Sequence, residues 1–473
     1  MKILLIQPPT NFVEQAYGIK QKVKFGHTPP LSLGYIAAYL EGDGHEVKIL
    51  DACALELDIE KTVDQAESFR PDLIGLTVLT NYKKYAKALA GKIKERMPGV
   101  VTVLGGAHAT YFFEEILDDM PGIDHVIRGE ADTVILDYAR YLNDPEKLHT
   151  LKGLVYRDTG GKIVVNPPVD LVRDLDTVPM PSWHLYDMSL YRPLPRQYRR
   201  LPFFTMITSR GCWWHRCKFC FQAGYCGVEY RRNSPERVVQ ELGILYHKYG
   251  IREIAFWDDT FIVNFNWLKT FTDLLKQKRL DVSWTASGRA NTITEKIIHT
   301  IYDAGCWSMF IGVESGNQEL LNMIDKGITL EQAREVFRAA NKTGIETRGA
   351  FMLGLPGETP KTGKETIKFA LELNPTYAIF YATHPRYGTQ LYDIAMHTGK
   401  FIDKEFRGMS KVTYIPDGYK DKRELEKIIR GGYIRFYLRP SYIIRMLSRI
   451  RSFNDAIELF KGFLLFLGLS SNR

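Results

Sequence analysis

The stretch Cys212-Trp-Trp-His-Arg-Cys217-Lys-Phe-Cys220 places three cysteines within nine residues, and these are half of the six cysteines of the chain. Thiolates are soft ligands, so three of them on one short loop can hold three irons of an iron–sulfur cluster. In a [4Fe–4S] cube the fourth iron would have no evident protein ligand and could bind a substrate or cosubstrate. The apolar run Phe203–Thr208 precedes the cysteines, and its composition predicts a short strand. We therefore expect the three cysteines on a loop that leaves a strand.

Two other interpretations of these thiols stay open. Zinc is usually held by four ligands, and Cys226 or His215 could supply the fourth. The three could also be unrelated thiols, because free cysteines are commonly buried. We expect the remaining cysteines, Cys53, Cys226 and Cys306, to be structural.

The composition is that of a globular protein, with 45% hydrophobic and 25% charged residues. A chain of 473 residues is long enough for two or three domains. No apolar run reaches the ~18 residues of a membrane-spanning helix, and the apolar N-terminus is too short for a signal peptide. Six cysteines, three of them clustered, suit a reducing cytoplasm better than a disulfide framework. The net charge of +8 is modest and would fit anionic substrates, a membrane surface or neither, and we expect no nucleic-acid partner.

Residues 1–145 alternate short apolar runs with helical patterns, which predicts a doubly wound, Rossmann-like α/β domain with a parallel sheet. The predicted strands are Lys2–Gln7, Glu46–Leu50, Pro71–Leu79, Val100–Leu104 and Asp124–Ile127, and the predicted helices are Leu31–Gly42 and Tyr82–Met97. In such sheets ligands bind outside the carboxyl ends of the strands. Gly105 and Gly106 would let the backbone approach a large ligand closely. The pattern alone allows a nucleotide-like or a tetrapyrrole ligand.

A proline-rich segment, residues 146–200, predicts a linker, because proline at this density excludes long helices. Within it, Gly153–Tyr156 and Lys162–Asn166 could form a hairpin. Residues 201–400 resume the alternation with about six strand–helix units, which predicts an open, partial (β/α)6 barrel. The predicted strands are Phe203–Thr208, Glu253–Trp257, Val282–Ser287, Cys306–Val313, Thr347–Leu353 and Tyr377–Ala382, and the predicted helices are Ser234–Tyr249, Glu295–Ala304, Leu330–Thr343 and Lys364–Leu373, with Ser234 and Thr294 as N-caps.

The segment Thr208–Cys220 resembles the cluster loop of radical S-adenosylmethionine enzymes. In that family the open iron chelates the amino and carboxylate groups of S-adenosylmethionine, whose reductive cleavage yields methionine and a 5′-deoxyadenosyl radical. The common family spacing is C-x3-C-x2-C, whereas this chain has one more residue between its first two cysteines, C-x4-C-x2-C. The resemblance therefore does not define the path of Trp213–Arg216 or the approach of His215 to the cluster.

The same resemblance implies roles for polar residues that follow the predicted barrel strands. Asp258 and Asp259 would face substrate and cosubstrate, and Arg289 would bind the methionine carboxylate through its planar fork. The implied contacts to the rest of the cosubstrate are Glu314 on the ribose hydroxyls, with Ser315 and Gly316 beside it, and Phe219 and the segment around Gly354 near the adenine. The alternative is that these strand-end polar groups satisfy the backbone of the loops.

Four segments of the first domain resemble the cobalamin-binding domain that precedes the radical domain in one large branch of this family: Pro29–Leu40, Gly44–Val47, Gly105–Thr110 and Arg128–Glu130. The resemblance covers most of residues 1–140 and implies a cobalamin site made by Thr77, Gly105, Gly106, His108 and Glu130. Asp43-Gly-His45 lacks the complete D-x-H-x-x-G pattern of cobalt-ligating domains. We therefore expect His45 in a turn, and we expect His108 to form a hydrogen bond rather than to bind cobalt.

Residues 401–473 are predicted as a helical C-terminal region that is basic and aromatic. Lys420–Arg430 predicts a helix, and Phe453–Leu469 is apolar but too short to cross a bilayer. Two alternatives stay open: this region lies on a membrane surface, or it caps the open barrel and buries the same residues. The first predicts that removal of residues 453–473 abolishes turnover and membrane partitioning.

The resemblance implies a cobalamin-dependent radical S-adenosylmethionine enzyme whose cofactors are a [4Fe–4S] cluster, S-adenosylmethionine and cobalamin. We expect it to methylate an unactivated carbon of a hydrophobic or lipid-like substrate, because an inert C–H bond is opened by hydrogen-atom abstraction and not by a general base. One alternative is an oxidative cyclase or rearrangement enzyme that acts on a tetrapyrrole or lipid without methyl transfer. Another is a binder without catalysis. A flavodoxin- or ferredoxin-type electron donor is expected, under anaerobic conditions, in the cytoplasm or at the inner face of the membrane.

Overall fold

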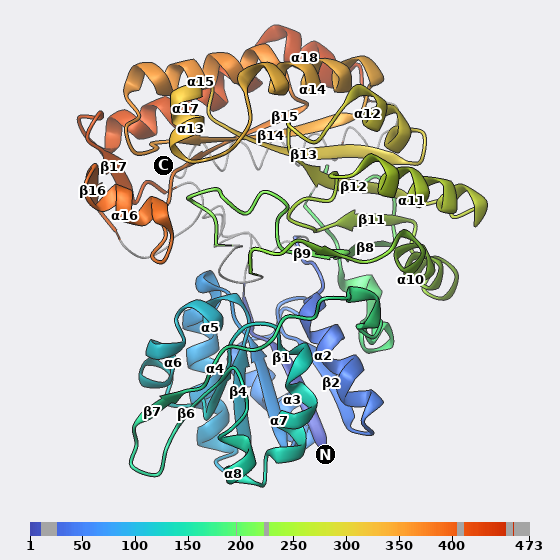
Figure 1. The fold of residues 1–473 in the computed structure, drawn as a ribbon, viewed down its shortest axis with the longest axis vertical. Helices are drawn as coiled ribbons and strands as arrows, with labels where there is room; N and C mark the ends of the chain where they lie inside the picture. The colour runs from blue at the N-terminus through green and yellow to red at the C-terminus, as the bar shows by residue number, and fades with distance from the viewer. Residues whose placement is uncertain (11–25, 195, 222–226, 404–410, 451–456, 458–473) are drawn as a thin grey trace. The chain divides into compact units, whose positions relative to one another are not determined.

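The computed structural model describes residues 1–10, 26–194, 196–221, 227–403, 411–450 and 457. These residues form two compact units (Figure 1). The first unit holds residues 1–10, 26–192 and 227–233, and the second holds the other described residues. None of the helices in the described part of the chain is long and apolar enough to cross a membrane.

The first unit is built on a seven-stranded sheet with the order β2-β1-β3-β4-β5-β6-β7. Its strands are β1 (Lys2–Gln7), β2 (Glu46–Asp51), β3 (Leu73–Thr77), β4 (Val101–Gly105), β5 (His125–Ile127), β6 (Leu154–Arg157) and β7 (Ile163–Val165). The first five strands run parallel, and the strand order reverses beside β1, which pairs with both β2 and β3. In doubly wound sheets the ligand binds at the carboxyl ends near this reversal. The predicted parallel sheet is confirmed.

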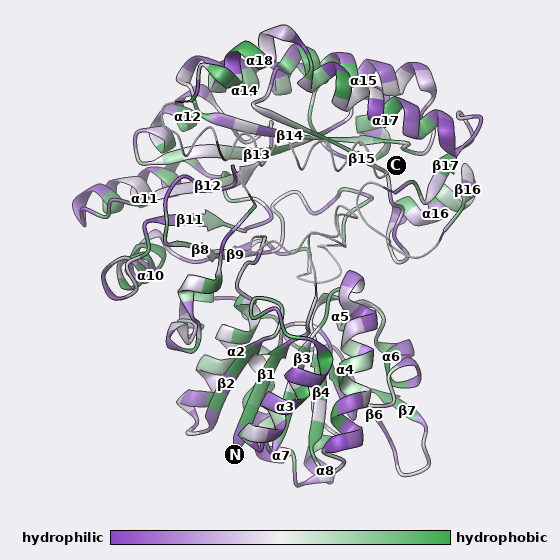
Figure 2. Ribbon diagram, turned by 180° about the vertical axis from the view of Figure 1, so that it is seen from behind, coloured by the Kyte–Doolittle hydropathy of each residue, from purple (hydrophilic) through white to green (hydrophobic). Residues whose placement is uncertain are grey.

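Helices cover this sheet and bury its strands. They are α2 (Leu31–Gly42), α3 (Ile59–Phe69), α4 (Lys83–Arg96), α5 (Ala107–Tyr111), α6 (Phe113–Asp119), α7 (Ile135–Tyr141) and α8 (Pro145–Leu148). Figure 2 colours β1 and β3 as predominantly hydrophobic, as parallel strands that are buried on both faces should be. Val63, Leu89 and Ile116, from α3, α4 and α6, share one core cluster with Leu4 and Ile74 of the strands.

Residues 146–192 belong to the first unit, which is a difference from the predicted linker. The predicted hairpin is confirmed, since β6 pairs antiparallel with β7 and extends the sheet beyond β5. Three aromatic residues then fix the following coil: Trp183, Tyr186 and Tyr191 are buried, and the Tyr191 hydroxyl lies 3.2 Å from a carboxylate oxygen of Asp51. The prolines exclude long helices here, but burial of the aromatic rings holds the segment in place.

The second unit contains a six-stranded, wholly parallel sheet with the order β15-β14-β13-β12-β11-β8. Its strands are β8 (Phe203–Met206), β11 (Glu253–Phe256), β12 (Ser283–Gly288), β13 (Cys306–Glu314), β14 (Glu346–Leu353) and β15 (Tyr377–Ala382). The helices are α10 (Pro235–Lys248), α11 (Phe265–Gln277), α12 (Glu295–Tyr302), α13 (Gln318–Met323), α14 (Leu330–Thr343) and α15 (Pro360–Leu373). Ser234 and Thr294 cap α10 and α12 as predicted. The open barrel of six strand–helix units is confirmed.

The C-terminal region closes one edge of this barrel. It contains α16 (Gln390–Met396), the pair β16 (Gly399–Phe401) and β17 (Tyr414–Pro416), and the helices α17 (Lys422–Tyr437) and α18 (Pro440–Leu447). The hydroxyls of Tyr433 and Tyr437 accept hydrogen bonds from the backbone N–H groups of Phe380 and Ala378, on edge strand β15. These contacts pair groups that an edge strand would leave open. Residues 422–447 therefore cap the barrel, whereas most of the segment 453–473 lies outside the described residues.

Candidate functional site

The three clustered cysteines follow β8 and lie at the carboxyl ends of the barrel strands. Cys212 and Cys217 are half-buried and Cys220 is exposed. The Cys212 sulfur is 3.3 Å from the Thr260 hydroxyl, and a guanidinium nitrogen of Arg289 is 3.6 Å from the Cys217 sulfur. Burial raises the pKa of the Cys217 thiol, and the charges of Lys326 and Arg289 oppose this effect. These cations offset part of the burial effect, but the pKa of Cys217 remains above its ordinary value.

These thiols do not converge on a single point. Among the described residues no three His, Cys, Asp or Glu side chains are placed to hold one metal ion. A zinc knuckle made from Cys212, Cys217 and Cys220 would need such a convergence, whereas each thiolate of an iron–sulfur cube binds a different iron. Cys226, a possible fourth zinc ligand, lies outside the described residues. Three thiolates on one loop have the chemistry of cluster ligands.

Trp214 anchors the cysteine loop, in which four residues separate Cys212 from Cys217. Its indole N–H donates to the carbonyl oxygen of Asp325 at 2.7 Å. The ring also packs against Gly327, where an added Cβ would come within 1.9 Å of it. The Lys218 N–H donates to the carbonyl oxygen of Ile324 at 3.0 Å. The loop is thus docked on the turn between α13 and α14.

The chain changes direction at His215, the residue after Trp214. His215 has φ of +43°, in the left-handed region that non-glycine residues seldom adopt, and its side chain is exposed. Arg216 then folds back, with its guanidinium 4.0 Å from the centre of a Trp214 ring and 3.6 Å from the Asp325 carboxylate. These contacts define the path of Trp213–Arg216 that the sequence left open.

Asp258 is buried and holds the start of the cluster loop. Its carboxylate accepts hydrogen bonds from the Thr208 N–H at 3.0 Å, from the Thr208 hydroxyl at 2.9 Å and from the Ser209 hydroxyl. Asp258 therefore satisfies polar groups of the loop, which is the alternative to a position facing the substrate. Asp259 has an exposed surface. Its pKa is nevertheless raised to about 6, mainly because the surrounding protein reduces its solvation and also because Asp258 is negatively charged.

A buried charge network surrounds the expected cosubstrate residues. Arg289 donates to the carbonyl oxygen of Lys326, and its Nε lies 3.3 Å from the Asn291 side-chain oxygen. The Lys326 ammonium lies 2.7 Å from one oxygen of Glu314, and the Tyr381 hydroxyl donates to the other at 2.8 Å. Arg289 follows β12, Glu314 ends β13, Tyr381 lies on β15 and Lys326 lies in the turn between α13 and α14. Lys326 and Tyr381 were not predicted from the sequence, since neither stands in a recognisable pattern.

The other expected cosubstrate residues of the barrel, Phe219, Ser315, Gly316 and Gly354, also lie in segments that follow the carboxyl ends of strands. Lys326 lies 5.8 Å from the centre of the Phe219 ring. The Gly316 N–H donates to the Thr366 hydroxyl, which also contacts Ser315. Gly354 has φ of +82° and donates its N–H to the buried Glu358 carboxylate, whose pKa burial raises to about 7. Glu358, which also accepts from the Tyr419 hydroxyl at 2.6 Å, is a further residue that was not predicted from the sequence.

Most of the expected cobalamin residues meet at the carboxyl ends of β3 and β4. Thr77 pairs with Gly105 across the two strands. Gly106 has φ of +102°, and an added Cβ there would lie 2.8 Å from the Val78 carbonyl oxygen. His108 is 3% exposed, and its Nδ1 lies 3.2 Å from the Thr80 hydroxyl. Its Nε2 has no hydrogen-bond partner in the described chain. Burial lowers the pKa of His108 to about 4, so the imidazole is neutral.

Two further residues of the first unit have other partners. Glu130 is buried in an ion pair with Arg231, which donates to it at 2.9 Å. His45 lies in the turn between α2 and β2, 3.4 Å from the Met1 amino group, as expected for a turn residue. The group formed by Thr77, Gly105, Gly106 and His108 fits a large ligand held by close backbone approach, with one unsatisfied nitrogen available to it.

Comparisons with known proteins identify both domains. The B12 binding domain matches residues 23–139, and the Radical SAM superfamily matches residues 206–370. A Pyrococcus horikoshii protein described as an uncharacterized methyltransferase is 36% identical over 450 residues and covers 94% of each chain. The anaerobic magnesium-protoporphyrin IX monomethyl ester cyclase of Rubrivivax gelatinosus is 29% identical over 88% of this chain and 75% of its own. The cytidylyl-2-hydroxyethylphosphonate methyltransferase of Streptomyces wedmorensis is 28% identical over 82% of this chain and 81% of its own.

Solved structures share the fold. The cobalamin-dependent S-adenosylmethionine radical enzyme OxsB, with aqua-cobalamin and S-adenosylmethionine bound, superimposes with a TM-score of 0.76 at 18% identity over 99% of this chain and 71% of its own. At that identity the likeness concerns the fold alone. The relative that is similar over its whole length, together with both domain matches, identifies the family. The chain belongs to the cobalamin-binding radical S-adenosylmethionine family, and it is an enzyme of that family whose cofactors are a [4Fe–4S] cluster, S-adenosylmethionine and cobalamin.

Proposed function

We propose that this enzyme transfers a methyl group to an unactivated carbon of a hydrophobic small molecule. The observation that carries the proposal is the relative that spans 94% of both chains and is described as a methyltransferase. The two strand-end sites support it, because methyl transfer to an inert carbon needs both hydrogen-atom abstraction and a methyl donor. The cluster and S-adenosylmethionine supply the first when bound, and cobalamin supplies the second.

In the second unit we assign Cys212, Cys217 and Cys220 to three irons of the cluster. Arg289 stands beside Cys217 and orients the carboxylate of S-adenosylmethionine. Glu314, with its oxygens held by Lys326 and Tyr381, fixes the position at which the ribose is bound. Asp258 is a positioning residue, since it holds Thr208 and Ser209 at the start of the cysteine loop. The protein thereby orients the cosubstrate and excludes water.

In the first unit we assign Thr77, Gly105, Gly106 and His108 to the cobalamin site. The absence of a side chain at Gly106 leaves room for a flat ligand against the backbone, since even a methyl group would meet Val78. The neutral His108 imidazole offers its buried Nε2 for one hydrogen bond to that ligand. We assign Glu130 to positioning, because its carboxylate holds Arg231.

Exposed aromatic side chains support a hydrophobic substrate. Trp257 directly follows β11 and is 56% exposed, and Trp213 in the cysteine loop is 43% exposed. Both follow strands at the carboxyl ends of the barrel, the end at which barrel enzymes perform their chemistry. Large exposed indoles at such an edge favour an apolar molecule. A flavodoxin- or ferredoxin-type protein would supply the electron.

A second candidate is oxidative ring closure on a tetrapyrrole without methyl transfer. The similarity to the Rubrivivax gelatinosus cyclase over 88% of this chain favours it as the alternative. Product analysis separates the two. We would incubate the anaerobically reconstituted enzyme with S-adenosylmethionine, a reductant and a small-molecule extract. Methyl transfer yields S-adenosylhomocysteine together with 5′-deoxyadenosine, whereas cyclisation yields 5′-deoxyadenosine alone.

A further inference from the structure

The outer face of α17 and α18 exposes a run of large aliphatic side chains. Ile444, Leu447 and Leu438 are 67%, 57% and 52% exposed. Three more exposed aliphatic residues accompany them: Ile434, Ile443 and Ile450. Six such residues within seventeen positions are unusual on a water-facing surface, where exposed aliphatic residues are normally scattered singly.

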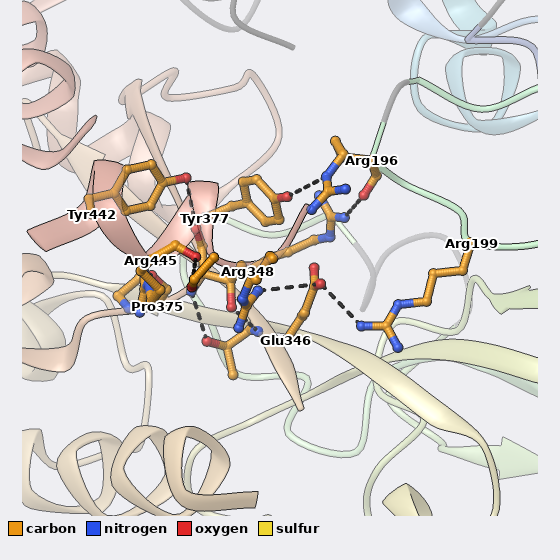
Figure 3. Close-up of polar contacts among 12 residues, drawn as sticks. Arg196, Arg199, Glu346, Arg348, Pro375, Tyr377, Tyr442 and Arg445 are labelled. Carbon is orange, nitrogen blue, oxygen red and sulfur yellow. Dashed lines mark hydrogen bonds and ion pairs between the residues drawn. The ribbon is translucent and has the colours of Figure 1, made fainter. Parts of the chain in front are cut away.

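The inner face of α18 fixes the rotation of the helix, so this apolar face cannot turn inward. The Tyr442 hydroxyl donates to the carbonyl oxygen of Thr376 at 3.1 Å, and Met446 is buried beside it. The Arg445 guanidinium donates to the carbonyl oxygens of Asn374 and Pro375 at 3.1 and 2.7 Å. Figure 3 shows Tyr442 and Arg445 pointing into this network at the amino ends of β14 and β15. Exposure of the opposite side therefore follows from the fold.

The charges around the apolar face have one sign. Residues 427–453 contain seven Lys or Arg residues and no Asp or Glu. Arg439, Arg445 and Arg449 are tied to the barrel. By contrast, Lys427, Arg430 and Arg435 are exposed. Lys427 and Arg430 share a stripe of α17 with Ile434 and Leu438, because their positions differ by three, seven and eleven residues.

We infer that this face binds an anionic lipid bilayer surface, with the aliphatic side chains in the acyl boundary and the cations on the headgroups. It is defined by Lys427, Arg430, Ile434, Arg435, Leu438, Ile443, Ile444 and Leu447. An amphipathic helix with a basic polar side binds such an interface through buried apolar area and attraction to anionic lipid. The inference concerns an interaction surface and does not depend on methyl transfer.

Charge complementarity favours a bilayer over the other possible occupants. A second copy of the chain would place cations against cations across the contact. The segment that follows, residues 451–473, carries Arg451, Lys461 and Arg473 against Asp455 and Glu458, so its net charge is positive and does not neutralise the cations of the face. An anionic surface satisfies the cations and the aliphatic side chains together.

Vesicle co-sedimentation of the full-length protein tests the inference. The probes are phosphatidylcholine vesicles with and without phosphatidylglycerol. We expect binding to the anionic vesicles that weakens with salt and little binding to the neutral ones. Ile444→Ser with Leu447→Ser should weaken binding by at least about tenfold, and Arg430→Gln with Arg435→Gln should weaken it in proportion to the lost charge. All four positions are exposed, so thermal unfolding should be unchanged.

Matched controls remove equivalent side chains elsewhere. Val165→Ser takes an exposed aliphatic side chain from β7, and Lys276→Gln with Lys278→Gln takes two exposed cations from the end of α11. Both controls should bind like the wild type. Equal binding to both vesicle types, or wild-type binding by the Ile444/Leu447 variant, would overturn the inference. So would binding lost on removal of residues 458–473 but kept in that variant, because the tail would then be the contact. A dimer that the variant dissociates, without vesicle binding, would also overturn it.

Discussion

The carboxyl ends of the two parallel sheets are built in opposite ways. In the first unit, Thr77, Gly105, Gly106 and His108 are uncharged at neutral pH, since burial lowers the pKa of His108 to about 4. In the second unit, the corresponding edge buries Asp258, Arg289, Glu314 and Lys326, all at 5% exposure or less. One edge offers bare backbone and a neutral imidazole, and the other offers fixed charges. Similar topology thus supports two kinds of recognition.

The difference suits the two cofactors. A large ring is held by close backbone contact, which requires small residues such as Gly106 at the edge. A cluster with a zwitterionic cosubstrate is held by thiolates and by groups of defined charge, and those charges must be paired because burial of an unpaired ion is costly. The pairing of Glu314 with Lys326 and the bracing of the loop by Asp258 meet this requirement.

Cys217→Ser should have the largest effect, on the charged edge alone. Loss of one thiolate leaves the cluster with two protein ligands from the loop, so we expect loss of bound iron and a fall in 5′-deoxyadenosine formation of at least about 10³-fold. Cobalamin content should stay at the wild-type level. Cys53→Ala is the control, since Cys53 lies in the first unit near Thr10. A Cys217 variant with full iron content would contradict the assignment.

Lys326→Met tests the buried ion pair. It leaves Glu314 without its cation in a buried position, and we expect a loss of about 3 kcal/mol in the free energy of unfolding, measured with urea. Lys342→Met, at an exposed position of α14, should change it by less than about 0.5 kcal/mol. Adding Glu314→Gln to Lys326→Met should recover part of the loss. A double variant less stable than Lys326→Met would speak against charge pairing.

Asp258→Asn tests the bracing of the cysteine loop. The amide cannot accept the hydrogen bonds from Thr208 and Ser209 with the same strength, so we expect iron affinity to fall 10- to 100-fold, about the range for residues that orient metal ligands. The electron paramagnetic resonance signal of the reduced cluster should also change. Asp259→Asn, at the exposed neighbour, should leave iron affinity unchanged. Equal iron loss in both variants would show that Asp258 has no special role.

Gly106→Ala tests the close backbone approach at the carboxyl ends of β3 and β4 in the first unit. The φ of +102° and the approach to Val78 make a side chain costly there, by about 2 kcal/mol in the free energy of unfolding. Cobalamin retention should fall as well, while iron content should not. Gly99→Ala is the matched control, because an added Cβ there meets nothing within 4 Å. If the Gly106 variant retains cobalamin like the wild type, the backbone approach proposed here is not used.

The two edges should respond to pH in opposite directions. His108 has a pKa of about 4 in the folded chain, so stability is lost as pH falls from about 6.5 towards 4, because only the unfolded state binds the proton. Glu358 has a raised pKa of about 7, so stability is lost as pH rises from about 4.5 towards 7. For each group, the free energy of unfolding should change by at most about 1.4 kcal/mol per pH unit. His108→Gln and Glu358→Gln should each remove one slope; the same pH profile in both variants would contradict this.

Local patterns predicted most of the elements. The helices Leu31–Gly42 and Leu330–Thr343 and the strand Tyr377–Ala382 have the predicted bounds, because apolar periodicity and the flanking turn residues are encoded within each segment. The N-caps Ser234 and Thr294 were predictable for the same reason. The motif residues at the strand ends were also recognisable, since strand ends follow from the strands.

What could not be predicted depends on contacts between distant segments. Lys326 and Tyr381 belong to the site only because their elements fold next to Glu314, 12 and 67 residues away in the chain. The role of Trp214 requires Gly327, more than a hundred residues later, and the capture of Glu130 by Arg231 is of the same kind. The density of prolines in residues 146–192 predicted a linker. Burial of the aromatic residues in this segment depends on the rest of the first unit and could not be predicted.

Following the methyl group of S-adenosylmethionine tests methyl transfer most directly. The reconstituted enzyme would be given S-adenosylmethionine with a trideuterated methyl group, a reductant and the small-molecule extract, and the products would be analysed by mass spectrometry. We expect a substrate-derived product that carries the trideuterated methyl group, formed together with S-adenosylhomocysteine and 5′-deoxyadenosine. Formation of 5′-deoxyadenosine with an unlabelled, oxidised product and no S-adenosylhomocysteine would contradict methyl transfer.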